Sequence, residues 1–412
     1  MRPILHLALL AATPICINLP AAANVIDDWN ERTVAFVTEA RLAPPDAERV
    51  MAMVHVAMFD AVNAIQKRYR PYLVQPAGSA TASQDVAATV AAGKVLLGMH
   101  PEAQAKFNAD LTRYLAATED GAARSEGIRI GEAVAARILE ARTGDGTAAL
   151  DAYRPKAKPG VYVATPMTVG SVWPKLKPFV MSSPAQFRPE PPISLSSQQW
   201  ATDYNEIKVF GGRASTKRSV RQTEDARFWL APGPVIYYPL VRQIAAANKL
   251  DVLDSARMMA LIAVARADAF VAIFDAKYHY EFWRPVTAIR NGDIDDNAAT
   301  ELDATWLPLA DTPMHPEYPC AHCIMVSTIV SVVESLFGTA DLPELSLTSP
   351  TAPGVTHRWS SLKALVEEVK EARIWAGFHY CFSTTVGEDM GRKIGEYTVK
   401  TVMQPITLAG AR

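Results

Sequence analysis

The chain has too little of several features to fit some broad classes of protein. Its 412 residues include four cysteines, too few for a disulfide scaffold in a chain this long. The 41 lysines and arginines against 43 aspartates and glutamates give a net charge of −2, so no basic surplus draws it to nucleic acid or an acidic membrane. With 49% hydrophobic and 20% charged residues, it is neither disordered nor a long charged coiled coil. The composition predicts a globular protein with a sizeable core.

Long apolar runs are also missing beyond the first residues. A membrane-spanning helix needs about 18 or more consecutive apolar residues. The best candidate, Met258 to Phe274, contains Arg266 and Asp268. It therefore predicts a buried helix and not a membrane span.

The first residues have the pattern of a secretory signal. Arg2 precedes a mostly apolar stretch, and alanines at 21–23 offer a cleavage site before Asn24. We expect 1–23 to be a signal peptide and the mature protein to be periplasmic or secreted. No membrane span is expected after cleavage.

Helical patterning dominates the N-terminal third. Between Glu48 and Ile65, apolar residues recur at spacings of three and four, the period of a helix with one buried face. Three more segments have helical character, and the short links between them are typical of a bundle. They are 87–99, 102–115 and 125–142. We therefore expect an N-terminal helical region at 24–150.

A proline-rich segment follows. Nine of the 29 prolines lie between Tyr153 and Ser196, together with Trp173, Phe179 and Phe187. Proline interrupts regular structure, and aromatic side chains favour burial. Residues 151–196 are therefore predicted to form an ordered strap packed on the surface.

Helical patterns return after the strap, and the alternation typical of strands is nearly absent. The helical segments are 198–209, 223–230, 253–283, 320–337, 359–376 and 387–403. The prediction is an all-α protein of helical bundles with a long proline-rich strap. A C-terminal helical region at 197–412 would carry the functional site and complete one compact unit over 24–412.

The first candidate site segment contains Lys277 and Arg284, followed by Pro285. On a continuous helix, seven residues are about 20° short of two turns, so the two cations would share a face about 10 Å apart. Pro285 predicts that the helix ends just after them. Two long cationic side chains can converge on one anion, although a solvated basic face would show the same spacing.

The second segment is His315-Pro-Glu-Tyr-Pro319-Cys320-Ala321-His322. Pro319 is typical of a helix start, and the apolar pattern that follows ends at Phe337 before Gly338. His322 is thus expected in a first helical turn, where free N–H groups and the helix dipole favour an anion. A histidine that only caps a core helix is the alternative.

The third segment contains Arg373 and His379. Six residues place them about 240° apart on a continuous helix, so they can meet only if the helix stops between them. Gly377 is the expected stop. Without it they would be an ordinary arginine and a buried histidine. Together, three cations, a helix N-terminus and two histidines suit an oxyanion such as phosphate or vanadate.

The order of these motifs resembles the three-part signature of a known superfamily. Lys277-x6-Arg284-Pro285, then Pro319-Cys-Ala-His322, then Arg373-x5-His379 is similar to the pattern of vanadium-dependent haloperoxidases and type 2 phosphatidic acid phosphatases (PAP2). Longer stretches resemble secreted bacterial haloperoxidase-like proteins over most of the expected mature chain. They are DAKYHYEFWRPVTAIR, TPMHPEYPCAH, AMVHVAMFDAVNAI and WPKLKPFVMSSPAQFRP. The resemblance implies an all-α fold with the anion at the end of one bundle.

The resemblance also implies roles. His379 matches the histidine that coordinates vanadium, or attacks phosphorus in the phosphatases, and His322 matches the acid–base histidine. Ala321 matches the glycine whose N–H donates to the oxyanion, and Cys320 the serine before it. The cations around the equatorial oxygens correspond to Lys277, Arg284 and Arg373. Lys277 would also polarise bound peroxide.

The implied reaction is oxidation of halide by hydrogen peroxide at a vanadate cofactor, for whose site phosphate competes. His315 falls where bromide-using members resemble one another in carrying histidine and chloride-using members in carrying phenylalanine, which favours bromide. The expected partners are hydrogen peroxide and halide, or a phosphoester, and no nucleic acid. A homodimer is an assembly that the sequence allows.

Three positions depart from the family pattern. Cys320 is a weaker hydrogen-bond donor than serine, and Ala321 narrows the approach that a glycine would leave open. The aspartate common four residues after the second histidine is Ser383 here. A serine cannot raise the basicity of its neighbours as a carboxylate would, which weakens the case for high activity.

Other interpretations remain open from the sequence. The same site could hydrolyse phosphoesters, with His379 as nucleophile and His322 as acid, or hold phosphate without turnover. Cys320-x-x-Cys323 has the spacing of thiol–disulfide exchange, but no βαβ pattern surrounds it. With Cys381 and a histidine these cysteines would make a zinc site, which lacks a second pair at matching spacing.

The cysteines themselves carry a prediction. Signal cleavage would remove Cys16 and leave three cysteines in an oxidising compartment. We expect Cys381 to pair with Cys323, or else with Cys320. A bridge that closes a longer loop stabilises the fold more than one that closes a short loop, and this bridge would contribute about 4 kcal/mol. Three free buried thiols are the alternative.

Overall fold

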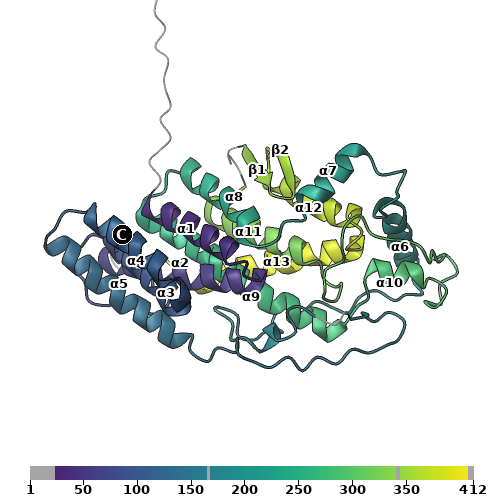
Figure 1. Cartoon of the computed structure of the whole chain (residues 1–412), viewed down its shortest axis with the longest axis horizontal. Helices are drawn as coiled ribbons and strands as arrows, with labels where there is room; N and C mark the ends of the chain where they lie inside the picture. Colours follow the sequence, from purple (N-terminus) through teal and green to yellow (C-terminus); the bar gives the residue numbers. More distant parts are fainter. Residues whose placement is uncertain (1–23, 165–167, 340–343, 407–412) are drawn as a thin grey trace, which may run out of the picture.

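The structure is a computed structural model that describes residues 24–164, 168–339 and 344–406. In these residues, thirteen α-helices and one two-stranded sheet form an elongated molecule (Figure 1). The predicted all-α fold class is confirmed. The expected signal peptide at 1–23 lies outside the described residues.

Five helices form the N-terminal end of the molecule, and four of them contain the segments predicted there. They are α1 (Val25–Glu39), α2 (Pro44–Gln66), α3 (Gln84–Met99), α4 (Gln104–Ala116) and α5 (Ala122–Ala141). α1 was not predicted. It begins after Asn24, whose side chain accepts hydrogen bonds from the N–H groups of Ile26 and Asp27.

The proline-rich segment has one short 3₁₀ turn, Trp173–Lys175, and otherwise irregular backbone in its described residues. It runs along the lower edge of the molecule in Figure 1. A carboxylate of the central helix holds it, because Asp268 accepts hydrogen bonds from the backbone N–H groups of Phe179, Val180 and Met181. The phenyl ring of Phe179 and the indole of Trp173 are buried.

The C-terminal part contains the remaining helices. They are α6 (Gln198–Phe210), α7 (Val220–Phe228), α8 (Pro234–Ala247), α9 (Val252–Tyr280), α10 (Pro285–Arg290), α11 (Ala321–Phe337), α12 (Leu362–Trp375) and α13 (Cys381–Thr401). The sequence did not predict α8, which carries Pro239 in its interior. α10, a single short helix, was not predicted either.

A β-hairpin between α11 and α12 was also not predicted. Strands β1 (Leu345–Ser349) and β2 (Ala352–Trp359) pair antiparallel, with Leu345 opposite Trp359. Trp359, expected at the start of α12, therefore ends a strand instead. β1 packs against α8. Two short strands give too few alternations to stand out against the helical pattern.

The core is organised around α9. Almost every residue of this helix from Leu253 to Lys277 is buried, as expected for the apolar run that includes Arg266 and Asp268. α2 covers one side of it, and α11 and α13, which pack closely together, cover another. α9 ends where the loops of the C-terminal region meet, which places its last turn at the candidate site.

The predicted continuous helix across Lys277 and Arg284 is wrong. α9 ends at Tyr280, and Glu281 adopts the left-handed conformation with a φ of 50°. Arg284 follows in extended backbone as the residue before α10. Pro285 begins a new helix instead of terminating the old one, because proline fits a first helical turn.

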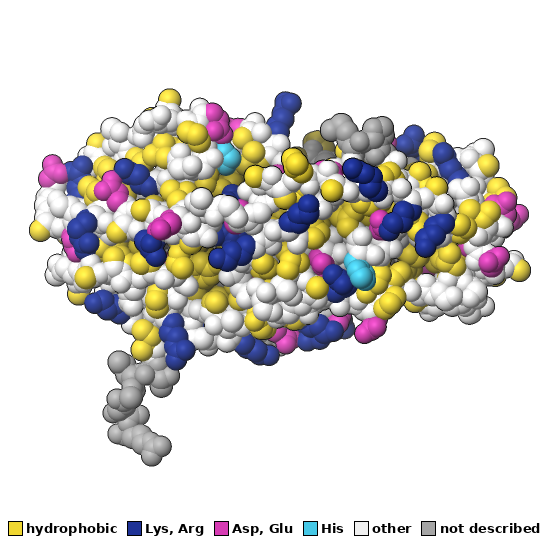
Figure 2. All heavy atoms as spheres, turned by 90° about the horizontal axis from the view of Figure 1, so that it is seen from below, with side chains coloured by type: hydrophobic (Ala, Val, Ile, Leu, Met, Phe, Trp, Pro, Cys, Tyr) yellow, Lys and Arg dark blue, Asp and Glu magenta, His cyan; other side chains and the backbone are white. Residues whose placement is uncertain are grey.

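The surface shows no patch of a single charge on the face seen in Figure 2. Basic and acidic side chains alternate there with apolar ones, in keeping with the net charge of −2. Among the described residues, no helix is long and apolar enough to cross a membrane.

Candidate active site

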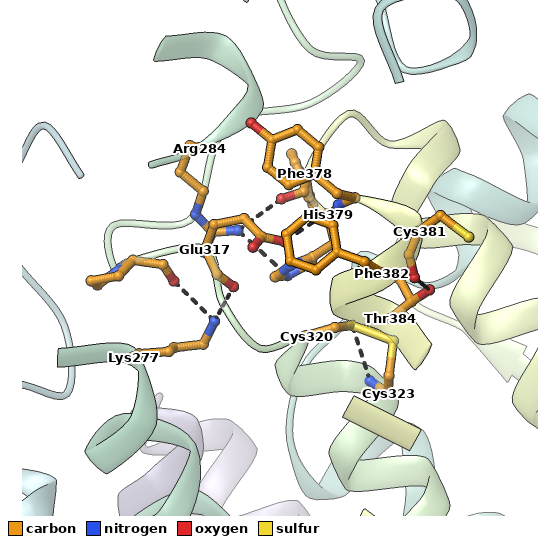
Figure 3. A network of polar contacts seen from close by, with 12 residues as sticks. Lys277, Arg284, Glu317, Cys320, Cys323, Phe378, His379, Cys381, Phe382 and Thr384 are labelled. Atoms are coloured by element: carbon orange, nitrogen blue, oxygen red, sulfur yellow. Dashed lines mark hydrogen bonds and ion pairs between the residues drawn. A yellow bond between two sulfur atoms is a disulfide. The ribbon is translucent and has the colours of Figure 1, made fainter. Parts of the chain in front are cut away.

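Three segments distant in sequence meet at the end of α9: the chain around Arg284, the loop before α11 and the loop between α12 and α13 (Figure 3). Direct contacts join them. Nη1 of Arg284 lies 3.4 Å from Nε2 of His379 and donates to the carbonyl of Phe378. Nε of the same guanidinium donates to the carbonyl of His315.

The predicted stop between Arg373 and His379 is present. α12 ends at Trp375, and Gly377 has a φ of 80°, a conformation that glycine adopts at little cost. A Cβ at Gly377 would also meet the backbone oxygen of Gly211 at 2.6 Å. The chain can therefore reverse here and present Arg373 and His379 to the same cavity.

The ring of His379 is oriented by a carboxylate that the sequence analysis assigned no role. Nδ1 of His379 lies 2.6 Å from Oε1 of Glu317, and both side chains are buried. An ionised Glu317 accepts a hydrogen bond from Nδ1–H, and this tautomer leaves a lone pair on Nε2 that can bind an electrophile or a metal. Ser383 stands where the family pattern has an aspartate, and Glu317 supplies an orienting carboxylate from a different loop.

Burial controls the titration of this pair. Desolvation raises the pKa of Glu317 to about 7, against the opposing effect of Lys277 and Arg284. The pKa of His379 lies well below its ordinary value, first because of burial and then because of nearby cations. His379 is thus neutral at pH 7, as a ligand or nucleophile must be.

Lys277 and Arg284 stand behind the histidines. Nζ of Lys277 donates to the carbonyls of Pro316 and Glu317, at 2.9 and 2.5 Å. Burial and the charge of Arg284 hold the pKa of Lys277 well below its usual range, and burial lowers that of Arg284 to about 10. An anion would offset this crowding of positive charge.

His322 and Arg373 each have a side-chain nitrogen that a ligand could bind. His322 lies in the first turn of α11, as predicted. Within the described residues, its Nε2 and the Nε of Arg373 are buried without a hydrogen-bond partner. Burial lowers the pKa of both groups, that of Arg373 to about 9. Buried polar groups without partners are costly, and a bound oxyanion would satisfy them.

A cavity of about 410 Å³ is lined by several of the predicted site residues. The predicted site residues that line it are His315, Ala321, His322, Arg373 and His379. Lys277, Arg284 and Cys320 are not among its lining residues. Apolar side chains such as Phe270, Phe274 and Phe378 form much of the remaining wall.

Cys320 does not offer the hydrogen-bond donor expected of it. Cys320 and Cys323 form a disulfide, and Cys381 is the free cysteine of the described chain (Figure 3). The predicted bridge from Cys381 is therefore wrong. A disulfide sulfur carries no hydrogen, so Sγ of Cys320 can only accept, which it does from the N–H of Cys323.

Arg266 lines the cavity, although the sequence analysis assigned it no role there. Its Nε donates to the buried carboxylate of Glu48, and its Nη1 has no hydrogen-bond partner among the described residues. It lines the cavity together with Tyr237, over whose ring the guanidinium lies. The sequence signal that could have identified Arg266 is its position as a charged residue inside an apolar helix.

Glu317 could likewise have been identified, because it is the carboxylate within the segment from His315 to His322.

The donor set fits a small oxyanion such as vanadate. The cavity offers a neutral histidine nitrogen, a partnerless histidine Nε2 and a guanidinium N–H. Two more buried cations lie nearby: Arg284 contacts Nε2 of His379, and Lys277 donates to the carbonyl of Glu317. Ala321 is the first residue of α11, whose first-turn N–H groups lack helical acceptors.

Comparison with known proteins agrees with this geometry. Residues 257–407 match the family described as the VCPO second helical-bundle domain. A vanadium chloroperoxidase from Curvularia inaequalis is 29% identical over 184 residues, 37% of this chain and 30% of that protein. The match therefore spans less than a third of that relative.

Solved structures share the fold. A bacterial vanadium-dependent iodoperoxidase superposes with a TM-score of 0.78 at 24% identity, over 93% of this chain and 97% of that one. A bacterial vanadium-dependent chloroperoxidase in its apo form gives 0.67 at 17% identity, over 87% and 93%. The chain therefore shares the fold of these vanadium-dependent peroxidases, and its residues 257–407 match the VCPO second helical-bundle domain.

Proposed function

We propose that the protein is a vanadium-dependent haloperoxidase that oxidises halide with hydrogen peroxide at a vanadate held by His379. The observation that carries the proposal is the buried Glu317–His379 pair. His379 lines the same cavity as Arg373 and His322, whose Nε and Nε2 atoms are buried without hydrogen-bond partners among the described residues. Bound vanadate supplies a Lewis acid that activates peroxide toward a nucleophile.

The chain's own residues would do the rest. Glu317 fixes the tautomer of His379, and the cations Lys277, Arg284 and Arg373 balance the charge of the oxyanion. His322 is suited to take up and return a proton at Nε2, since its lowered pKa keeps it neutral at pH 7. The aromatic wall around Phe270, Phe274 and Phe378 limits access of water.

For the halide we propose bromide, because His315 stands in the cavity wall and contacts Arg284. Nη2 of Arg284 lies 3.0 Å from Nδ1 of His315. The relatives named above oxidise chloride or iodide by their names, so the halide must be measured directly.

Phosphoester hydrolysis is the second candidate, and Glu317 is the observation that favours it. A nucleophilic histidine needs an orienting carboxylate, and Ser383 does not supply one. Glu317 meets that need, since a carboxylate at Nδ1 raises the nucleophilicity of Nε2. The same site without turnover in either reaction would be an oxyanion-binding protein.

One set of assays separates these functions. Purified protein, freed of metal and phosphate, is assayed with and without added vanadate for peroxide-dependent halogenation with iodide, bromide and chloride. Hydrolysis of p-nitrophenyl phosphate is measured in parallel. We expect vanadate-dependent halogenation that phosphate inhibits. Hydrolysis that vanadate inhibits, with no halogenation, would establish the phosphatase instead. Vanadate binding without either activity would indicate a binding protein.

A further inference from the structure

A cluster of ionisable groups lies outside the cavity, where α7, β2 and α12 meet. Nε2 of His357, on β2, lies 3.5 Å from Oδ1 of Asp225 and 3.7 Å from Oε1 of Glu224, both on α7. Nδ1 of the same ring lies 2.6 Å from Oε1 of Glu368 on α12. The His357 side chain is 0% exposed. One ligand atom from each of Glu224, Asp225 and His357 lies close enough to the other two for the three to share one cation.

Glu368 contacts His357 on the side of the ring that faces away from α7. Its carboxylate accepts hydrogen bonds from the indole N–H groups of Trp229 and Trp359, each at 2.9 Å, in addition to His357 Nδ1. A carboxylate in contact with Nδ1 is the arrangement found where a histidine binds a metal through Nε2.

Nε2 of His357 is left without a partner. It makes no hydrogen bond to any described residue, although it is fully buried and faces two carboxylates. The ring cannot turn away, because it stacks on Phe228 with centroids 3.9 Å apart and an interplanar angle of 6°. A cation bound between Nε2 and the two carboxylates would give this buried nitrogen a partner.

The charge of the cluster also calls for a cation. Glu224, Asp225 and Glu368 bring three carboxylates, and Arg221 brings one guanidinium, whose Nε lies 2.8 Å from Oδ1 of Asp225. The Arg221 side chain is 60% exposed and contacts Glu224 and Glu368 at 3.5 and 3.9 Å. It can therefore turn into solvent and leave the oxygen of Asp225 to another ligand.

We propose that His357, Asp225 and Glu224 form a binding site for one divalent transition-metal ion, with Zn²⁺ as the representative. In tetrahedral zinc sites, metal–ligand bonds of about 2.0–2.2 Å place neighbouring ligand atoms roughly 3.4 Å apart. The measured 3.5 and 3.7 Å need little adjustment. Imidazole together with carboxylate suits zinc and similar ions better than calcium or magnesium.

The position of this site suggests a structural role. An ion there would join α7 to β2, while Glu368 links the same ring to α12. Trp229 directly follows α7, and its carbonyl accepts a hydrogen bond from Nη1 of Arg373 in the cavity. The ion would thus support the loop that positions one cation of the candidate active site. Glu224, whose side chain is 38% exposed, gives the ion access from solvent.

The test uses the full-length protein after chelator treatment and dialysis, without vanadate. Calorimetric titration with Zn²⁺ is expected to give one ion per chain, and Co²⁺ is expected to give the visible absorption of a tetrahedral site. Glu224→Gln and Asp225→Asn should each weaken Zn²⁺ binding by about tenfold or more. Zn²⁺ should raise the unfolding temperature of the wild type more than that of either variant.

Asp203, Glu206 and Cys381 form a second group of ligand atoms close together and provide the control. Asp203 there already accepts hydrogen bonds from Phe382 N–H and the Gln199 amide. Cys381→Ser should therefore leave Zn²⁺ affinity unchanged. Absence of Zn²⁺ binding, or binding lost in Cys381→Ser and retained in Glu224→Gln, would overturn the proposal. Because Glu224 is partly exposed, its variant is informative even if Asp225→Asn fails to fold.

Discussion

Oε1 of Glu317 lies 2.6 Å from Nδ1 of His379, and the two side chains are 0% and 2% exposed. This contact between a buried carboxylate and a buried imidazole affects the chemistry of the histidine as well as its position. The pair determines which histidine nitrogen faces the cavity, and burial keeps that nitrogen neutral. The Glu317–His379 pair therefore gives the most direct tests of the site.

Replacing Glu317 with glutamine removes the charge while nearly preserving shape. We expect the affinity for vanadate to fall by roughly 10–100-fold, the usual effect of losing the group that orients a metal-binding histidine. Calorimetry or inhibition by vanadate measures it. Glu396→Gln, on the exposed face of α13, is the control and should bind as the wild type does.

The same variant predicts a pH effect with a definite sign. Burial raises the pKa of Glu317 to about 7, so the carboxyl is increasingly protonated as the pH falls below that value. A protonated Glu317 resembles glutamine, and the difference in vanadate affinity between wild type and Glu317→Gln should shrink from pH 8 to pH 5. A constant difference over this range would show that the charge of Glu317 is not what matters.

The two cavity histidines should fail in different ways. His379→Ala removes the proposed ligand, so tight binding of vanadate or phosphate should be lost. His322→Ala removes an acid–base group and should retain binding while turnover falls by about 10²–10⁴-fold. Binding by calorimetry and turnover are measured on the same samples. Equal loss of affinity in both variants would refute these roles.

The Cys320–Cys323 disulfide leads to a gain-of-binding prediction. Cys320→Ser restores a hydroxyl donor at the start of α11, and one hydrogen bond to a charged group contributes about 1.5–3 kcal/mol. We expect vanadate to bind about tenfold more tightly. Cys323→Ser also breaks the disulfide but leaves a weakly donating thiol at 320, so its gain should be much smaller. Equal affinities for both variants would show that residue 320 does not reach the anion.

The anchor of the strap makes a prediction about stability. The two oxygens of Asp268 accept hydrogen bonds from three consecutive backbone N–H groups. In Asp268→Asn an amide NH₂ replaces one oxygen and faces a backbone donor, which should lower the free energy of unfolding by about 1–3 kcal/mol. Denaturant titration measures this cost, and limited proteolysis should reveal earlier cleavage near 179–181. Asp60 holds the backbone at 72–74 in the same manner. Asp60→Asn should lower stability without exposing the strap.

The cost of Asp268→Asn should depend on pH. Burial raises the pKa of Asp268 to about 6, above the ordinary value of 3.8. A carboxyl with a raised pKa favours the folded state most at low pH, and this contribution is lost as the pH rises through about 6. The difference in unfolding free energy between wild type and variant should therefore be larger at pH 4 than at pH 7. The opposite trend would mean that the folded state binds the charged form.

His315 provides a test of halide preference. If this histidine favours bromide, His315→Phe should raise the ratio of chloride to bromide oxidation, because a phenyl ring cannot form the hydrogen bond between residue 315 and Nη2 of Arg284. The ratio is compared at matched vanadate occupancy. An unchanged ratio would remove His315 from the halide pocket.

Several features followed from local sequence alone. The helical period located most of the long helices, and the apolar run of α9 predicted a buried helix despite Arg266 and Asp268. Gly377 predicted the turn that brings Arg373 and His379 together, because that position needs a positive φ. Pro319 and the apolar pattern after it placed His322 in a first helical turn. Each of these depends on residues within a few positions of one another.

Tertiary structure decided the partners of those residues. The carboxylate that orients His379 belongs to Glu317, 62 positions earlier, and not to a residue at position 383, which is a serine. Cys320 pairs with its neighbour Cys323 and leaves Cys381 free, contrary to the entropic preference for a longer loop. Local patterns predicted the backbone conformation at these positions, but which buried groups touch depends on how several loops pack at the end of α9. Sequence spacing does not encode those distances.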